Sequence, residues 1–341
     1  MRMAHHNNDM TVEMHMIARK ACSAVAWGLF ACTGLTAPSL AAESYPDRPP
    51  TWIVGYPAGG GSDFLARKVA QQLGSQLGQP VIIENKPGAS TIIAAQAAAR
   101  APADGYTLFT ADNGSLILNP ALHSRLSYKA GDFAPVGLMA RFPLLLVTDS
   151  AGPYATAAAL IDAARKNPLL IQFASPGAGG PHHMAMELLK ARADFQAEHI
   201  PYKGAAPAVQ DVLAGRVPAM MLDTATAQPH IQAGKLRPLA VASASRLPIY
   251  PGVPTLKELG YDVEVYAWQG LVVPAATPPA IRERLASELQ KSLENPRVKA
   301  ALTEFGLEVT PSTPATMQRF IESETALWQA LIQERGIRLE N

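Results

Sequence analysis

Residues 51–67 read TWIVGYPAGGGSDFLAR and join an apolar run to an amphipathic run through three consecutive glycines. After the glycines, leucine or valine recurs every fourth residue from Leu65 to Leu77, which predicts one apolar face of a helix. The stretch therefore predicts a β-strand, a bare turn and a helix N-terminus. Unpaired backbone N–H groups and the helix dipole make such a junction attractive to anions.

Composition sets the broad class of the protein. The chain has 341 residues, of which 48% are hydrophobic and 17% are charged, and its formal net charge is +1. This is enough for a sizeable core in one or two domains. The sequence has no basic block, so a nucleic-acid partner is not expected.

Residues 1–41 have the form of a secretory signal peptide. Arg19 and Lys20 precede the apolar stretch ACSAVAWGLFACTGL, and small residues precede a predicted cut after Ala41 or Ala42. Glycine, threonine and proline interrupt the apolar stretch, which lacks the ~20 unbroken apolar residues of a membrane span. Because residues 1–13 are unusually polar for a signal start, Met14 and Met16 are alternative initiators. Export to the periplasm is the expectation.

Both cysteines, Cys22 and Cys32, lie within this segment. Its removal leaves a chain without a disulfide, a thiolate metal site or a cysteine nucleophile. In the alternative interpretation Cys32 is a lipid-modified first residue, a signal that Phe30 fits poorly.

The order of predicted elements indicates two lobes. Short apolar strands alternate with amphipathic helices, which is typical of parallel sheets covered by helices. Two long extended runs, 136–149 and 266–278, enclose a complete set of strand–helix units. This arrangement predicts two crossing strands, with lobe 1 formed by residues 42–142 and 269–341 and lobe 2 by residues 143–268. Ligands of such proteins sit in the cleft between the lobes.

A second turn, SPGAGGP at residues 175–181, has the design of the first, because it also follows a predicted strand and opens a predicted helix. Glycines allow a tight turn and a close approach of an anion to the N–H groups. Neither turn contains Lys or Arg, and neither has P-loop or dinucleotide-binding spacing. Two matching turns therefore predict a carboxylate clamp rather than a phosphate site. The simpler interpretation of each is a tight strand–helix turn.

Polar side chains beside the turns have two interpretations each. Ser62 and Ser175 can donate hydroxyl hydrogen bonds or cap helices, and Asp63 suits an N-cap or first-turn position. Asp223 ends a predicted strand, where it can accept from a ligand hydroxyl or amine, or cap the next helix.

The chain is not expected to be an enzyme. Ser175, His183 and Asp223 can be imagined as a triad, but Phe-Ala-Ser-Pro-Gly lacks the nucleophile-elbow pattern. Pro176 also removes a backbone N–H that an oxyanion hole would use. His182 and His183 lie on different helix faces, so a shared metal is not expected. His183 is expected to pack or cap, and His182 to point toward solvent or the cleft. A secreted serine hydrolase is the remote alternative.

The chain resembles the Bug/TctC family, the extracytoplasmic solute-binding proteins of tripartite tricarboxylate transporters. The resemblance covers nearly the whole mature part of the chain. It rests on an ordered series of segments that includes YPAGGGSDFLAR, VIIENKPGA, APADGYTLFTADNGSLILNPAL, FASPGAGGPHHMAMELL and PYKGAAPAVQDVLAGRVPAMMLD. It implies a type II periplasmic-binding-protein fold, an α/β fold whose two lobes have mixed, mostly parallel sheets joined by two crossing strands.

The resemblance also implies a function. Members of the family close two lobes on a small organic acid, and the two glycine turns hold one carboxylate, partly through ordered waters. They are usually monomers, need no cofactor, and pass the ligand to the membrane permease subunits of the transporter. Some members instead sense the ligand for a sensor kinase of a two-component regulator, which is the main alternative here.

Residue roles carry over at matching positions. The resemblance places Tyr56 beside the ligand, matches His183 to the family's usual histidine and puts Asp223 in the cleft. Residues 90–93, Ser-Thr-Ile-Ile, replace a glycine-rich stretch, which predicts a narrower and more apolar pocket. Gly180 lacks a hydroxyl common at that position.

A third loop, residues 113–115, is expected to supply a polar contact in place of that missing hydroxyl. The full set of predicted ligand contacts is Tyr56, Ala58, Gly59, Gly60, Gly61, Ser62, Asp63, Asn113, Ser115, Ser175, Gly177, Gly179, Gly180, His183, Asp223 and Thr224.

Overall fold

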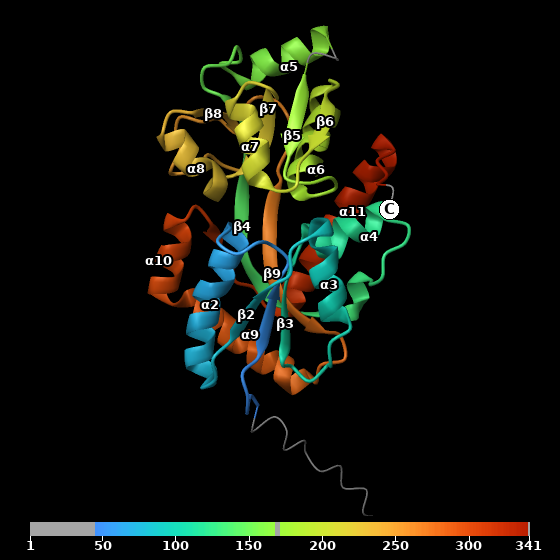
Figure 1. Cartoon of the computed structure of the whole chain (residues 1–341), viewed down its shortest axis with the longest axis vertical. Coiled ribbons are helices and arrows are strands. Elements are labelled where there is room, and N and C mark those ends of the chain that lie inside the picture. The colour runs from blue at the N-terminus through green and yellow to red at the C-terminus, as the bar shows by residue number, and fades with distance from the viewer. Residues whose placement is uncertain (1–44, 168–170, 340–341) are drawn as a thin grey trace, which may run out of the picture. The chain divides into compact units, whose positions relative to one another are not determined.

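The computed structural model describes residues 45–167 and 171–339. The predicted signal peptide and both cysteines lie outside the described residues. Within them, Figure 1 shows two groups of strands and helices connected by two long strands. The strand order is β2-β1-β3-β9-β4-β7-β5-β6, with β8 and β10 paired to β4 off this path. The strands are β1 (Thr51–Val54), β2 (Ile82–Asn85), β3 (Thr107–Asp112), β4 (Phe133–Asp149), β5 (Gln172–Ser175), β6 (Glu198–Pro201), β7 (Ala219–Asp223), β8 (Leu236–Val241), β9 (Tyr266–Pro274) and β10 (Glu308–Val309).

The crossing strands are β4 and β9, and they run antiparallel to each other (Figure 1). β4 pairs with β9 from Phe133 to Pro143 and then with β7 and β8 from Leu144 to Asp149. We call the part of the sheet that contains β1, β2, β3, β9 and β10 the first half. The part that contains β5, β6, β7 and β8 is the second half.

Strand direction follows the predicted mixed sheet. Parallel pairs join β1 to β2 and β3 in the first half, and β5 to β6 and β7 in the second. Every ladder that involves β4 or β9 is antiparallel, because the chain returns through the centre rather than by another helical crossover. The predicted α/β class and crossing strands are confirmed. The predicted lobe boundaries at residues 142/143 and 268/269 stay a prediction.

Helices cover both faces of each half. One face of the first half carries α2 (Gly61–Leu77), α9 (Pro279–Glu294) and α10 (Pro296–Glu304), packed over buried Trp52, Val54 and Leu271. The other face carries α3 (Ile92–Ala99), the π-helical turn η3 (Gly114–Leu118), α4 (Asn119–Leu122) and α11 (Pro314–Arg335). In the second half, α5 (Ala157–Lys166) and α6 (Pro181–Ala193) cover one face, and α7 (Ala205–Leu213) and α8 (Thr224–Gln232) cover the other.

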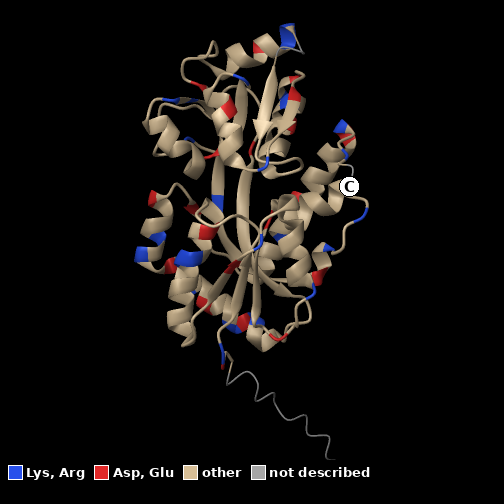
Figure 2. Ribbon diagram, viewed as in Figure 1, with Lys and Arg blue, Asp and Glu red and all other residues tan. Residues whose placement is uncertain are grey.

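Charge is distributed without a dominant sign. Figure 2 shows Lys and Arg interspersed with Asp and Glu over both halves. Among the residues described by the structure, no helix is long and apolar enough to cross a membrane.

Candidate functional site

The first glycine turn joins β1 to α2. Gly59 has a φ of +83°, a left-handed conformation that glycine adopts without a steric penalty, and Gly60 is the N-cap with no side-chain cap. Ala58, Gly59 and Gly60 are exposed, and Gly61 is half-buried. The first N–H groups of α2 have no acceptor within the helix, so the turn presents backbone donors beside solvent.

The carboxylate of Asp63 is hydrogen-bonded to the first turn and its neighbours. Its Oδ2 accepts from the Gly59 N–H at 2.9 Å and from Arg67 Nε at 2.8 Å, and its Oδ1 accepts from Asn85 Nδ2 at 2.9 Å. Asn85 also donates to the Tyr56 carbonyl at 3.0 Å. Burial by itself would raise the pKa of Asp63, but the bonds from Arg67, Gly59 and Asn85 outweigh it and lower that pKa.

Ser62 connects the turn to a crossing strand. Its hydroxyl accepts from Nε2 of Gln269, a residue of β9 that is only 5% exposed. Gln269 Oε1 is buried and has no hydrogen-bond partner among the residues of the two described ranges. Gln269 therefore offers an unpaired acceptor next to the first turn. Its position inside an apolar strand, 207 residues from Ser62, gave no local sequence signal.

The second turn, between β5 and α6, repeats the geometry of the first. Gly179 has a φ of +73°, and its N–H donates at 3.0 Å to Nδ1 of His183, four residues later. Gly180 is the N-cap, with φ and ψ of −78° and 170°, against −82° and 174° for Gly60. Gly177 and Gly180 are half-buried. The predicted similarity of the two turns thus extends to their hydrogen bonds, and His183 ties the turn to α6, whose N-cap Gly180 has no side-chain cap.

Ser175 lies beneath the second turn. It is fully buried, its Oγ lies 2.7 Å from Nε2 of His199, and it donates to the Gly177 carbonyl at 2.8 Å. His199 stacks on His183, with ring centroids 3.8 Å apart. Burial, helped by the neighbouring His183, lowers the pKa of His199 to about 3. His199 was not predicted, because β6 is separated from the turn by the whole of α6.

The end of β3 carries a buried carboxylate that the sequence analysis also missed. Asp112 accepts from the Tyr56 hydroxyl at Oδ2, and at Oδ1 from the Ser115 N–H and hydroxyl, both at 2.7 Å. Burial raises the pKa of Asp112 in spite of these bonds. Burial, and then the Asp112 charge, raises the pKa of Tyr56, to which Asp223 also contributes. A strand that ends on an acid was the available signal, as it was for Asp223.

The third loop is committed to the scaffold. Asn113 Oδ1 accepts from the Trp268 N–H at 2.9 Å, and Nδ2 donates to the Tyr266 carbonyl at 3.2 Å, which extends the β3–β9 ladder by a side chain. Asn113 and Ser115 are fully buried. Their polar atoms already have partners, and a ligand contact from either residue stays a prediction.

Asp223 caps α8 at the carboxyl end of β7. Its Oδ1 accepts from the Thr226 N–H and its Oδ2 from the Thr226 hydroxyl, both at 2.9 Å. His182 Nε2 lies 3.4 Å from Oδ2, although it is not aligned for a hydrogen bond. Burial opposes ionisation, yet His182 and Thr226 outweigh it and lower the pKa of Asp223. Of the two interpretations of Asp223, the cap is therefore observed.

Two hydrogen bonds join the halves around these turns. Ser90 Oγ donates to the Ala178 carbonyl in the second turn at 3.2 Å. Thr224 Oγ1 donates to the carbonyl of Gly306, which follows α10, at 2.6 Å. Both turns, β3, β7 and β9 therefore meet in one region.

Comparison with known proteins identifies the family. The family model described as "Tripartite tricarboxylate transporter family receptor", TctC, matches residues 65–337. The chain belongs to the TctC family. It is 38% identical over 296 residues to the UPF0065 protein in the tcbD–tcbE intergenic region of Pseudomonas sp. strain P51, covering 86% of this chain and 88% of that one. It is 34% identical over 316 residues to Protein BugT of Bordetella pertussis, covering 92% and 97%.

Solved structures of similar proteins support the fold of this TctC chain. An R. palustris protein solved with adipate has a TM-score of 0.81 and 33% identity, and covers 86% of this chain and 99% of its own. The periplasmic binding protein BugD has a TM-score of 0.79 and 31% identity, with 87% and 100% covered. MatC from Rhodopseudomonas palustris with bound malate has a TM-score of 0.77 and 29% identity, with 84% and 100% covered.

The backbone is left-handed at residues 89–91, the last two of which belong to the stretch 90–93 that is predicted to replace glycine-rich sequence. Ala89, Ser90 and Thr91 have φ values of 46°, 47° and 75°, so three consecutive residues with a Cβ occupy the left-handed region. Such a conformation costs roughly 1–2 kcal/mol per residue. Of the two isoleucines predicted to make the pocket more apolar, Ile92 packs against the core and Ile93 is 49% exposed, and their part in a pocket lining stays a prediction.

Contacts in the TctC chain also bear on the imagined triad. Ser175 pairs with His199, Asp223 lies beside His182, and His183 accepts from a backbone N–H. The three residues do not contact one another as a triad. Within the described ranges, no group of three or more His, Cys, Asp or Glu side chains could hold a metal ion.

Proposed function

We propose that this TctC protein captures a small organic carboxylate between its two glycine turns and delivers it to the permease subunits of a tripartite tricarboxylate transporter. The repeated geometry of the turns is the observation that carries the proposal. In each turn the N–H of a left-handed glycine is tied to the first turn of the following helix, and the other N–H groups at that helix start have no acceptor within the helix; α6 offers one fewer because it begins with Pro181.

Side chains around the turns define the rest of the proposed pocket. Tyr56 and Asp223 are near enough for the Asp223 charge to affect the Tyr56 pKa. Gln269 Oε1 supplies an unpaired acceptor on the side of the first turn. These acceptors favour an acid that also carries a hydroxyl or amino group, because a buried acceptor without a donor is costly.

The hydrogen bonds Ser90–Ala178 and Thr224–Gly306 support closure as the mechanism. A ligand that touches both turns favours the closed arrangement by the difference between its affinities for the closed and open states. Adipate and malate in structures of similar proteins support the ligand class. We further propose that the protein works in the periplasm, where residues 1–41 direct it as a signal peptide.

Binding is tested by titration calorimetry of the purified protein with adipate, malate, amino acids and aromatic acids. We expect saturable binding of at least one acid, and the methyl ester of that acid should lose most of the affinity. Binding of neutral esters as tight as that of the acids, or no binding by any acid, would contradict the clamp. Delivery is tested separately by uptake of the labelled acid in cells with and without the permease subunits.

A further inference from the structure

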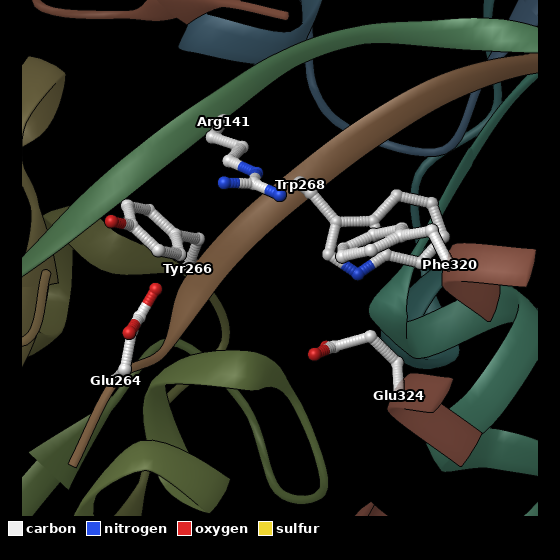
Figure 3. A pocket seen from close by; sticks show the side chains of 6 residues that line it. All are labelled: Arg141, Glu264, Tyr266, Trp268, Phe320 and Glu324. Carbon is white, nitrogen blue, oxygen red and sulfur yellow. The ribbon is translucent and has the colours of Figure 1, made fainter. Parts of the chain in front are cut away.

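A cavity lies at the crossing strands, and none of the predicted ligand contacts lines it. Its volume is about 270 Å³, and it lies between β4, the start of β9 and α11 (Figure 3). This is near the lower end of the size of small-molecule sites and much larger than one water molecule requires. The cavity is lined by Arg141, Glu264, Tyr266, Trp268, Phe320 and Glu324.

Strand register places this cavity on the opposite side of the sheet from the first turn. Arg141 pairs with Trp268 across the β4–β9 ladder, so both side chains share one face. Neighbouring residues of a strand point to opposite faces, and Gln269, next to Trp268, reaches Ser62 of the first turn. A molecule in this cavity is therefore separated from the first glycine turn by the thickness of the crossing strands.

Two buried donors in the cavity lack acceptors. Trp268 is 1% exposed, and its indole N–H makes no aligned hydrogen bond within the described part of the chain, although it lies close enough to the Glu324 carboxylate to lower the pKa of that acid. Arg141 Nε is also buried and unpaired, although the guanidinium carbon lies 5.0 Å from the Tyr266 ring centre and 5.3 Å from that of Phe320. Aromatic faces hold the guanidinium but do not accept its N–H groups in the plane, so an acceptor is missing.

Carboxylates lie across the cavity from the guanidinium. Figure 3 shows Glu264 and Glu324 opposite Arg141, with open space between them. Arg141 forms no ion pair with either acid. The Trp328 indole donates to Glu324 at 3.1 Å, and the Trp268 indole also lies near this carboxylate and helps to hold down its pKa, which burial raises. Opposite charges that line one partly buried cavity without touching leave room for a molecule that bears both charges.

We propose that this cavity binds a small zwitterion of the amino-acid type. Its carboxylate accepts from Arg141 and the Trp268 indole, and its ammonium group lies between Glu264 and Glu324. Either charge alone would leave the opposite side of the cavity unsatisfied. The inference does not depend on the carboxylate clamp, because the two sites share no residue.

The test uses the Trp268 indole as a reporter. The chain has four tryptophans, so the indole region of a ¹⁵N spectrum is simple, and Trp268→Phe identifies the relevant signal. The full-length protein is titrated to about 10 mM with β-alanine and with γ-aminobutyrate, a range that detects the millimolar affinity expected of so small a ligand. Butyrate and butylamine are the single-charge controls.

We expect at least one of the two zwitterions to shift the Trp268 signal saturably, and butyrate and butylamine to bind about tenfold more weakly or not at all. Arg141→Gln and Glu264→Gln should each weaken binding by about tenfold. Glu322→Gln should not, because Glu322 is an exposed acid of the same helix α11 that does not line the cavity.

Three outcomes would overturn the proposal. They are a Trp268 signal that neither zwitterion moves, equal responses to butyrate and γ-aminobutyrate, or titrations that Arg141→Gln and Glu264→Gln leave unchanged. Glu264 is exposed, so its variant keeps the test decisive if Trp268→Phe does not fold.

Discussion

The N–H of Gly59 donates to the Asp63 carboxylate at 2.9 Å, four residues along the chain. The same relation joins Gly179 to His183 at 3.0 Å in the second turn. A carboxylate and an imidazole thus have the same role, because each supplies one acceptor atom for the N–H of the left-handed glycine. Each turn is tied to the helix that follows it by a side chain of that helix, and this makes the stability of each turn separately measurable.

Replacing Asp63 by Asn should loosen the first turn. The amide oxygen can accept from fewer donors than the carboxylate, which here binds Gly59, Arg67 and Asn85. We expect a loss of about 1.5–3 kcal/mol in the free energy of unfolding, measured by urea denaturation, and weaker acid binding. The control is Asp262→Asn, an exposed acid. Because the folded pKa of Asp63 is lowered from 3.8, its contribution is present above that pH and lost as pH falls through the folded pKa. An Asp63 variant with wild-type acid stability would contradict this role.

Tyr56→Phe tests how much the hydrogen bond from Tyr56 stabilises the buried Asp112 carboxylate. The variant removes the hydroxyl donor from Oδ2 of a carboxylate that is 2% exposed. We expect a loss of about 1–3 kcal/mol near neutral pH and a further rise in the pKa of Asp112. Because the lost hydrogen bond stabilises the ionised form of Asp112, whose folded pKa is already raised, the penalty should shrink as pH falls and Asp112 takes up a proton. Thermal denaturation between pH 7 and pH 4 measures this, and a penalty that grows on acidification would exclude the explanation.

Protonation of His199 should destabilise the second turn. The folded pKa of about 3 lies below the ordinary 6.5, so the unfolded chain binds the extra proton first. This contribution to stability is present above pH 6.5 and falls by roughly 1.4 kcal/mol per pH unit as pH drops toward 3. His199→Phe preserves a ring that can stack on His183 and should flatten this part of the pH profile.

Two substitutions of Ser90 distinguish the contribution of its hydrogen bond to Ala178 from the cost of its left-handed backbone. Ser90→Ala removes the hydroxyl that reaches Ala178, and we expect acid binding to weaken by about two- to tenfold. Ser90→Gly removes the same bond but also relieves the φ of 47°, so it should raise the unfolding free energy by about 1 kcal/mol relative to Ser90→Ala. Calorimetry and urea denaturation measure the two effects. Equal stability of the two variants would show that the turn carries no strain.

Glycine replacements distinguish the two turns. Gly59→Ala adds a Cβ at φ +83° with no atom within 4 Å, whereas a Cβ on Gly179 at φ +73° would lie 2.6 Å from Leu339 Cδ1 and 2.9 Å from Leu122 Cδ1. We expect Gly59→Ala to cost about 1–2 kcal/mol and Gly179→Ala more. In a Leu339→Ala background, Gly179→Ala should lower the melting temperature by less than it does in the wild-type protein, because the clash with Leu339 is removed. Identical costs for both glycine variants would mean that Leu339 and Leu122 move freely.

Local patterns predicted much of the fold, because strand and helix periodicity, glycine turns and the extended run at 136–149 depend on nearby residues. Site partners were harder to predict. Gln269 lies in an apolar strand, and His199 reaches Ser175 only because β5 and β6 are neighbours in the sheet. Asn113 illustrates a different limit, since a polar residue after a strand can serve a ligand or the backbone, and here it extends the ladder to β9. A local pattern predicts which residue types lie near a turn, but the pairing of strands far apart in the sequence decides which side chains contact each other.

The connection between the halves is a two-stranded antiparallel ribbon, and its mechanics follow from that. Hydrogen bonds from Phe133 to Pro143 prevent β4 and β9 from sliding past each other, but a ribbon can bend and twist across its width. The ladder shifts register between Pro135 and Gly137 and again between Leu138 and Ala140, where extra residues interrupt the pairing. In the proposed opening, ladder bonds that resist sliding and register shifts that allow bending would favour a rotation of one half against the other. We therefore expect Tyr56 and Ala178 to separate along an arc.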